Sequence, residues 1–282
     1  MVEAGRMRVR TGLILGAAGV FVGLAVAPQA QAQSLNDRWW IQGAGYWASV
    51  DSHARVTSVG NTSLGTEIDF ETDLGLDENE VLPSFSGGFR AMRRLIIGLD
   101  YYKLDRSATR TLSRDIVFDD VTYPASVSLS SSMDTDIYRL TLGYAFIQND
   151  TWEAGAALGL HATDFETELV GEASVGGVGG TATRRQKDFL APLPTVGLFA
   201  NWQVAPKVTV NGRVDYMSLE VGDYDGGVTN AQISASYRFT DHVGAGVFYR
   251  FVSYDVDITK DDWTGGADYE FSGPGVFLEV AF

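Results

Sequence analysis

The 282-residue sequence contains no cysteine, only three histidines, and fewer basic than acidic residues, 21 against 36. Without cysteine the chain forms no disulfide and has no thiol nucleophile, so its stability has another source. The formal net charge of −15 argues against a nucleic-acid partner, because binding phosphates requires clustered lysine and arginine side chains. After residue 32 no apolar run reaches the roughly 18 residues of a membrane-spanning helix, which excludes such a helix there.

The first 32 residues have the pattern of a secretory signal peptide. Three arginines between positions 6 and 10 precede an apolar run, Thr11–Ala27, and Ala30–Ala32 supplies the small residues of a cleavage site. The apolar run is shorter than the ~20 residues that a helix needs to span a bilayer. We therefore expect residues 1–32 to be removed after export. The remaining chain, 33–282, would carry a net charge of about −17, because three arginines and one glutamate are lost.

Beyond residue 32 the dominant pattern is an alternation with a period of two. In Ile137–Phe146 one phase holds large apolar side chains, and the other holds small or polar ones. Successive side chains of a β-strand point to opposite faces, so this segment is predicted to be a strand with one apolar and one small-polar face. Turn residues follow, and Thr151–Asp164 repeats the alternation, which predicts a β-hairpin.

Hairpins of this kind recur and predict about ten strands, with eight or twelve as alternatives, each of the ~9–11 residues that span a bilayer when tilted. The connections are short on one side and long on the other, where they cover roughly residues 52–82, 106–133, 165–188, 220–227 and 257–268. This asymmetry is typical of an outer-membrane barrel with short periplasmic turns. The predicted fold class is therefore all-β, a single closed antiparallel up-and-down transmembrane β-barrel.

Aromatic residues fall at both ends of the predicted strands. Beside the short turns or the terminus are Phe89, Phe146, Trp152, Trp202, Phe239 and Phe282, and at the opposite ends are Tyr101, Tyr138, Tyr216 and Tyr249. Amphipathic rings collect at the membrane–water boundary, so the two groups predict an aromatic girdle at each interface. Cross-strand packing in a soluble sheet is the alternative, but it would need a second sheet to cover the apolar rows.

The final residues alternate in the same way and end on an aromatic side chain. The signal peptide, the alternating strands, the loop asymmetry and this ending together resemble the outer-membrane β-barrel proteins of Gram-negative bacteria. In that family such an ending resembles the signal read by the barrel-assembly machinery, and the matching positions here are Val276, Leu278, Val280 and Phe282. The resemblance covers essentially all of residues 33–282. It implies an outer-membrane location, contact with outer-membrane lipid and lipopolysaccharide, and a monomer.

If the apolar phase faces lipid, the other phase lines the lumen. Its charged members form a predicted lumen charge network: Arg90, Asp100, Arg139, Glu153, Arg213, Asp215, Arg238, Arg250 and Glu279. Charges in a confined interior are costly unless they are paired, so we expect a cross-linked interior. A narrow polar pore that selects solutes is the alternative. Glu279 is expected to meet an interior arginine, which favours a closed barrel.

Acidic residues concentrate in the predicted external loops. Glu67–Glu80 holds seven carboxylates and no basic residue, and Asp255–Trp263 is also acidic. Clustered oxygen ligands suit divalent cations, although the twelve-residue calcium-loop motif is absent. The alternative is a set of solvated loops that repel one another by charge. No cofactor and no defined metal site are implied.

Catalysis at the rim would require a general base, and the chain offers three histidines. His161, near the outer end of a predicted strand with Asp164 close in sequence, is the better candidate. His53 lies beside Asp51 and Ser52, and His242 lies in a predicted periplasmic turn. The motifs of serine hydrolases and zinc proteases are absent.

The sequence therefore favours a non-enzymatic integral outer-membrane barrel with a structural, surface-interaction or limited small-solute passage role. Two alternatives stay open. One is a rim-located hydrolase, either a protease or a lipid-modifying enzyme, that uses His161. The other is an adhesin that acts through its acidic extracellular loops.

Overall fold

The computed structural model describes residues 35, 37–58, 67–118, 121–175, 178–221, 223–259 and 263–282. These residues are mostly β-strand, and none of them is in a helix. Accordingly, the described part of the chain offers no helix with the length and apolar character needed to cross a membrane. The predicted signal peptide, residues 1–32, lies outside the described residues.

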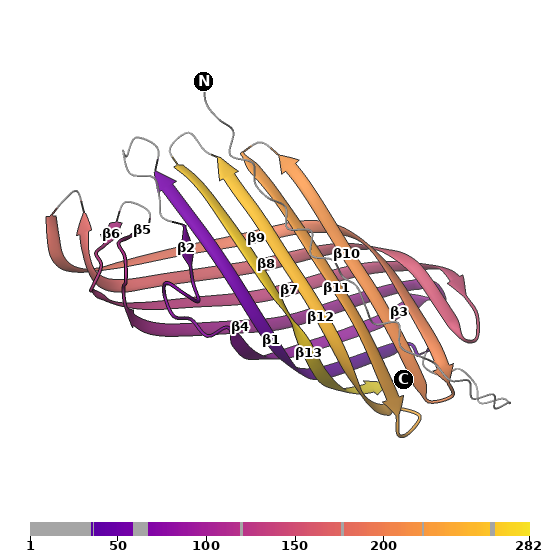
Figure 1. The fold of residues 1–282 in the computed structure, drawn as a ribbon. Coiled ribbons are helices and arrows are strands. Elements are labelled where there is room, and N and C mark those ends of the chain that lie inside the picture. Colours follow the sequence, from indigo (N-terminus) through magenta and orange to yellow (C-terminus); the bar gives the residue numbers. More distant parts are fainter. Residues whose placement is uncertain are drawn as a thin grey trace, which may run out of the picture. The chain divides into compact units, whose positions relative to one another are not determined.

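Ten long strands form one closed antiparallel barrel, in which each strand pairs with the next long strand and β13 pairs with β1 (Figure 1). They are β1 (Trp39–Ser58), β3 (Asn79–Met92), β4 (Leu95–Thr111), β7 (Ser128–Gln148), β8 (Trp152–Val175), β9 (Val178–Ala205), β10 (Val208–Val221), β11 (Tyr224–Arg238), β12 (Val243–Thr259) and β13 (Trp263–Ala281). The prediction of a closed up-and-down barrel of about ten strands is confirmed.

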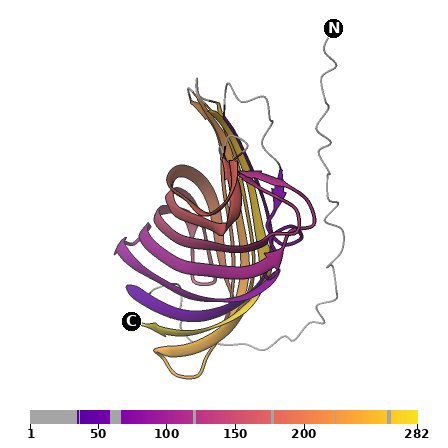
Figure 2. The same cartoon turned by 90° about the vertical axis from the view of Figure 1, so that its left-hand side faces the viewer.

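Three short strands belong to the outer end of the barrel, away from the short turns. β2 (Ile68–Asp69) pairs with β1 where β3 no longer does, so it continues the wall. β5 (Ile116–Phe118) and β6 (Val121–Tyr123) pair with each other, and β6 also pairs with the outer end of β8. Figure 2 shows the long strands curving around one axis, and Figure 1 shows β2, β5 and β6 at the end of the barrel away from the C-terminus.

The half of the barrel next to the short turns carries an apolar belt on its outer surface. In β7 the outward side chains Leu140, Leu142 and Tyr144 are 47–53 % exposed, whereas the intervening Arg139 and Thr141 are buried. Both predicted aromatic groups point outward, and Trp152 stacks on Trp202 with ring centroids 5.0 Å apart. An exposed apolar band flanked by aromatic rings is the surface that a membrane barrel presents to lipid.

Above this belt the polarity of the two faces inverts. Along the outer half of β7, Leu129, Met133 and Ile137 are buried inside the barrel, and Asp134 and Asp136 point outward. A polar outside and an apolar inside are what water on the outer surface requires. The strands therefore continue well beyond the membrane, and the prediction of long loops at roughly 106–133, 165–188, 220–227 and 257–268 is largely wrong.

The outer half of the barrel consequently has a hydrophobic core of its own. Inward side chains of the long strands pack there with Phe70, Leu74 and Leu76, from the segment that joins β2 to β3. The β5–β6 hairpin adds Ile116 and Tyr123, both fully buried. The region predicted as a solvated acidic loop is thus partly a core element.

Candidate functional site

The lumen at the level of the apolar belt is crossed by a charged network centred on Arg139 of β7. Its Nε donates to Asp100 of β4 at 2.8 Å, and its Nη1 donates to Asp215 of β10 at 3.2 Å. Arg213 binds both oxygens of Asp215, at 2.7 and 2.9 Å, and also donates to Thr141 at 2.8 Å. The network crosses the lumen, because β8 and β9 separate β7 from β10 around the wall of the barrel.

Two further ion pairs lie closer to the short turns. Arg90 of β3 forms a bidentate pair with Glu153 of β8, at 2.6 and 3.1 Å. Arg238 of β11 pairs with Glu279 at 3.1 Å and with Asp37. The pairs Arg90–Glu153 and Arg238–Glu279 each join two strands that are not neighbours. Through Asp37, Arg238 also binds the chain just before β1, so these contacts brace the periplasmic end of the barrel.

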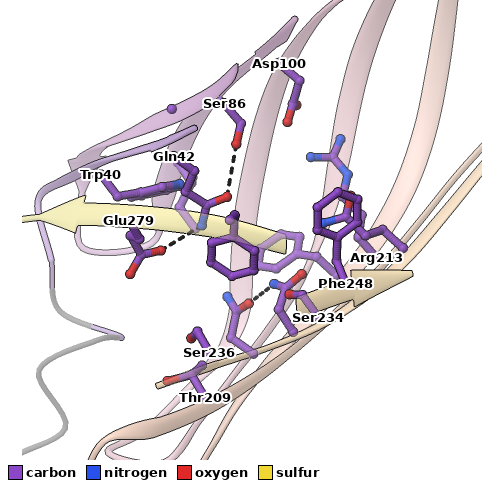
Figure 3. Close-up of a pocket in the computed structure, with 18 of the residues that line it drawn as sticks. Trp40, Gln42, Ser86, Asp100, Thr209, Arg213, Ser234, Ser236, Phe248 and Glu279 are labelled. Atoms are coloured by element: carbon purple, nitrogen blue, oxygen red, sulfur yellow. Dashed lines mark hydrogen bonds between the residues drawn. The ribbon is translucent and has the colours of Figure 1, made fainter. Parts of the chain in front are cut away.

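Glu279 also accepts a hydrogen bond from Gln42 at 2.7 Å, and Ser86 donates to Gln42 at 3.0 Å (Figure 3). The expected meeting of Glu279 with an interior arginine is therefore present in the structure, with Arg238 as the arginine. The outward neighbours of Glu279 are Leu278, 66 % exposed, and Val280, 40 % exposed. Val276 and Phe282 are outward as well, so all four predicted assembly residues lie on the lipid face.

All nine residues of the predicted charge network except Asp215 line one cavity of about 230 Å³ in this half of the lumen. Asp215 is fully buried behind Arg139 and Arg213. The cavity runs from Asp37 and Trp40 at the periplasmic end to Arg250 and Phe248 near the middle of the barrel. Neutral polar side chains, among them Ser86, Ser234 and Ser236, point toward it between the charged groups (Figure 3).

An apolar seal, defined here as Tyr46, Tyr102, Tyr254, Tyr269 and Phe271, lies directly above the cavity. Each of these side chains is at most 3 % exposed. Tyr102 of β4 packs edge-on against Phe271 of β13 with centroids 5.9 Å apart. Tyr254 of β12 reaches Thr163 on the opposite wall, with their oxygens 3.4 Å apart. Aromatic side chains thus separate the polar cavity from the outer end.

A second charged cluster, outside the membrane level, ties the segment after β2 to the barrel. The carboxylate of Glu71 binds Arg106 and accepts hydrogen bonds from the Ser52 hydroxyl at 2.7 Å and its amide at 3.0 Å. Close by, burial raises the pKa of Asp73, but hydrogen bonds from Arg114 and from the Asp69 amide lower it more, so the net pKa lies below its usual value. Sequence reasoning missed this cluster, because it placed Arg106 in a loop.

The structure separates the two residues of the predicted catalytic site. His161 is fully buried inside the barrel, and neither ring nitrogen has a hydrogen-bond partner in the part of the chain that the structure describes. Asp164 is exposed on the outer face of the same strand. Residues three apart in a strand point to opposite faces, so His161 and Asp164 form no catalytic pair.

His53 has the arrangement that His161 lacks. It lies outside the membrane level on β1 and is about one-third exposed. Its Nδ1 lies 3.2 Å from a carboxylate oxygen of Asp51, and its Nε2 lies 3.7 Å from a carboxylate oxygen of Asp69. Among the residues that the structure describes, no group of three or more histidine and carboxylate side chains has the geometry of a metal site.

Comparison with known proteins bears on the fold. No protein-family model matches the chain, and no curated protein is similar in sequence. Among solved structures, the outer membrane protease OmpT of Escherichia coli is similar, with a TM-score of 0.57 and 11 % identity over 87 % of this chain and 97 % of that one. The toluene transporter TodX of P. putida has a TM-score of 0.38 and 10 % identity over 90 % and 93 % of the chains. The outer membrane protein OprG of Pseudomonas aeruginosa has a TM-score of 0.37 and 8 % identity over 86 % of this chain and 95 % of that one.

The likeness to OmpT shows the fold and nothing further, at an identity this low. The other two TM-scores are too low to support an inference. The chain therefore has the fold of the Gram-negative outer-membrane β-barrels, and its apolar belt is the surface that places such a barrel in a bacterial outer membrane. The resemblance seen in the sequence is confirmed at this level.

Proposed function

We propose that this protein is a non-conducting barrel of the bacterial outer membrane, with a structural role in the membrane and an outer end that meets partners at the cell surface. The apolar seal carries this proposal. A hydrated ion or polar solute that passed Tyr102 and Phe271 would lose most of its water and meet few hydrogen-bonding groups, at a cost of several kcal/mol per unsatisfied polar group. The ion pairs beneath the seal brace the wall, in keeping with the cross-linked interior expected from the sequence.

The length of the strands supports the second part of the proposal. β7, β8 and β9 have 21, 24 and 28 residues, and a tilted strand needs only about 9–11 to span a bilayer. About half of β7 and more than half of β8 and of β9 therefore stand outside the membrane. Outside the membrane, the outer face of the barrel wall carries Asp105 of β4, Asp134 of β7 and Glu166 of β8, which lie side by side in register. This acidic wall favours partners with basic groups or bridging cations.

Electrical recording in planar lipid bilayers tests the proposal. The purified barrel should give no conductance steps, whereas the double variant Tyr102→Ala, Phe271→Ala should conduct, because both rings that meet across the seal are gone. Heat-modifiable migration in gels confirms that each sample is folded and inserted. Regular conductance steps from the unmodified protein would overturn the proposal.

A second candidate function, hydrolysis at the outer rim, is favoured by the position of His53. Asp51 orients the ring of His53 through Nδ1, and Nε2 lies 3.7 Å from Asp69, too far for a direct hydrogen bond, so Nε2 has the position of a general base. Peptide and lipid A hydrolysis by the purified barrel tests this candidate. Turnover should vanish in His53→Ala and persist in the control His161→Ala. Absence of turnover on both substrates removes the candidate for them.

A further inference from the structure

The five arginines that line the lumen cavity differ in their counter-charges. Arg90, Arg139, Arg213 and Arg238 each lie within 3.2 Å of at least one carboxylate oxygen. Arg250 of β12 has no carboxylate within ion-pair distance in the part of the chain that the structure describes. Asp100 lines the same cavity, but its Oδ2 is held by Arg139 at 2.7 Å. The guanidinium of Arg250, at the inner end of the cavity, therefore has no direct ion pair among the described residues and interacts with Asp100 only at longer range.

The surroundings of Arg250 hold its guanidinium in place. The side chain is only 6 % exposed, and its Nε donates to Gln232 at 2.8 Å. Its Cζ lies 4.9 Å from the ring centroid of Tyr102 and 5.3 Å from that of Phe248. The Tyr46 hydroxyl donates to the Arg250 carbonyl at 3.2 Å and fixes the backbone as well. An orientation fixed in this way reduces the entropy lost when a ligand binds.

These contacts leave hydrogen-bonding capacity unused. Nη1 of Arg250 is buried and has no hydrogen-bond partner among the described residues. Cation–π contacts stabilise a charged group by less than the burial of an unpaired charge costs. The rings therefore offset only part of the cost of burying Arg250, and an anion in the cavity beside the guanidinium would offset the rest.

The cavity has the size and lining for such an anion. Its volume of about 230 Å³ equals that of roughly seven or eight water molecules in the liquid, enough for a small organic acid. Ser84, Asn211, Ser234 and Gln42 line it and offer hydroxyl and amide donors. Asp37 and Trp40 mark its periplasmic end, and the apolar seal closes the other end, so a ligand would enter from the periplasm.

We propose that the periplasmic half of the lumen is a binding site for a small oxyanion, with Arg250 as the residue that holds its charge. The guanidinium presents paired N–H donors that match the two oxygens of a carboxylate or of a phosphate. The hydroxyl and amide groups of the wall bind the remaining oxygens of the ligand. This site goes beyond the proposed non-conducting role and does not depend on it, because it needs only the inner half of the lumen.

Calorimetric titration of the folded barrel in detergent with malate, and separately with inorganic phosphate, tests the site. The native protein should bind at least one probe saturably with one site per barrel. Arg250→Gln should weaken that binding at least tenfold. Gln232→Glu should weaken it as much while keeping Arg250, because the new carboxylate occupies the guanidinium. Arg110→Gln, the same kind of substitution at the outer end, should leave it unchanged.

Each outcome decides the proposal. Malate binding without phosphate binding assigns a carboxylate ligand, and the reverse assigns a phosphate. Lack of saturable binding of both probes at 20 mM, about the weakest affinity of use in a cell envelope, overturns the site. Equal affinity in the native protein and in Gln232→Glu overturns the role of Arg250, and this variant decides the question even where Arg250→Gln does not fold.

Discussion

Replacing Arg139 by methionine tests whether the lumen network holds the barrel together. Methionine fills much of the same volume but removes the hydrogen bonds to Asp100 and Asp215. Asp215 keeps Arg213 as a partner, whereas Asp100, 14 % exposed, loses the only arginine within ion-pair distance among the described residues. Breaking a buried pair by removing one partner costs about 3–5 kcal/mol. We expect a loss near the lower end, about 3 kcal/mol, because Asp100 lies beside a polar cavity.

Unfolding by urea in lipid vesicles, followed by tryptophan fluorescence, measures this loss. Lys103→Met is a matched control on β4, because Lys103 pairs with Asp105 at 2.9 Å on the exposed outer face. Exposed pairs of this kind contribute little to stability. The double variant Arg139→Met, Asp100→Asn should recover part of the loss, since no unpaired carboxylate remains at that position. An Arg139→Met variant as stable as Lys103→Met would refute the bracing role of the network.

Two further predictions concern the outer wall and the C-terminus. Burial first, and then neighbouring carboxylates, raise the pKa of Asp255 and of Asp268, which face each other across β12 and β13. The two carboxylates repel each other fully when the pH is above their raised pKa, and the repulsion disappears when the pH falls below the usual carboxyl pKa, because both groups are then protonated. Asp268→Asn should therefore add about 0.5–1 kcal/mol to the free energy of unfolding at pH 7 and nothing near pH 3. Unfolding at both pH values measures this, and equal gains would contradict it. Phe282 stacks on Trp39 at 4.5 Å, so Phe282→Ala should lower the heat-modifiable inserted fraction in cells several-fold, with Phe282→Tyr as the control. Unchanged insertion would refute that role.

The membrane half of the fold could be predicted from the sequence, because lipid imposes a single rule on every strand. Leu140 and Leu142 must face out and Arg139 must face in, so the period-two pattern gives the strand, its two faces and its neighbours. The inward position of Arg139 and Glu279 follows from that pattern. Their partners do not, because Asp215 and Arg238 come from strands distant in the sequence.

The outer half was mispredicted for a physical reason. On the outer side of Tyr138, β7 keeps its period of two, but the apolar Met133 and Ile137 face into the barrel and the acidic Asp134 and Asp136 face outward. The sequence-based prediction requires apolar side chains on the outward face of every strand, so it places the end of the strand where these side chains become polar. The inversion itself was the signal available in the sequence, and it also marks where water replaces lipid outside the barrel.

The catalytic hypothesis failed on the same geometry of the strand. His161 and Asp164 are close in sequence, but an interval of three residues places them on opposite faces. His53 lies on the same face as Asp51, and β2 brings Asp69 to its other side. The position of Asp51 on the face of His53 follows from the sequence, because the two residues are two apart in one strand. The approach of Asp69 does not, because it depends on where the two-residue strand β2 pairs with β1.

The central claim is that the lumen is open toward the periplasm and sealed toward the outside. Because the chain has no cysteine, a single Ser234→Cys places one thiol in the cavity, and Asp77→Cys places one on the exposed outer end. A membrane-impermeant maleimide applied to intact cells should label Asp77→Cys and leave Ser234→Cys unlabelled. Ser234→Cys should then react once the reagent is admitted to the periplasm. Labelling of Ser234→Cys from outside as fast as Asp77→Cys would contradict the seal.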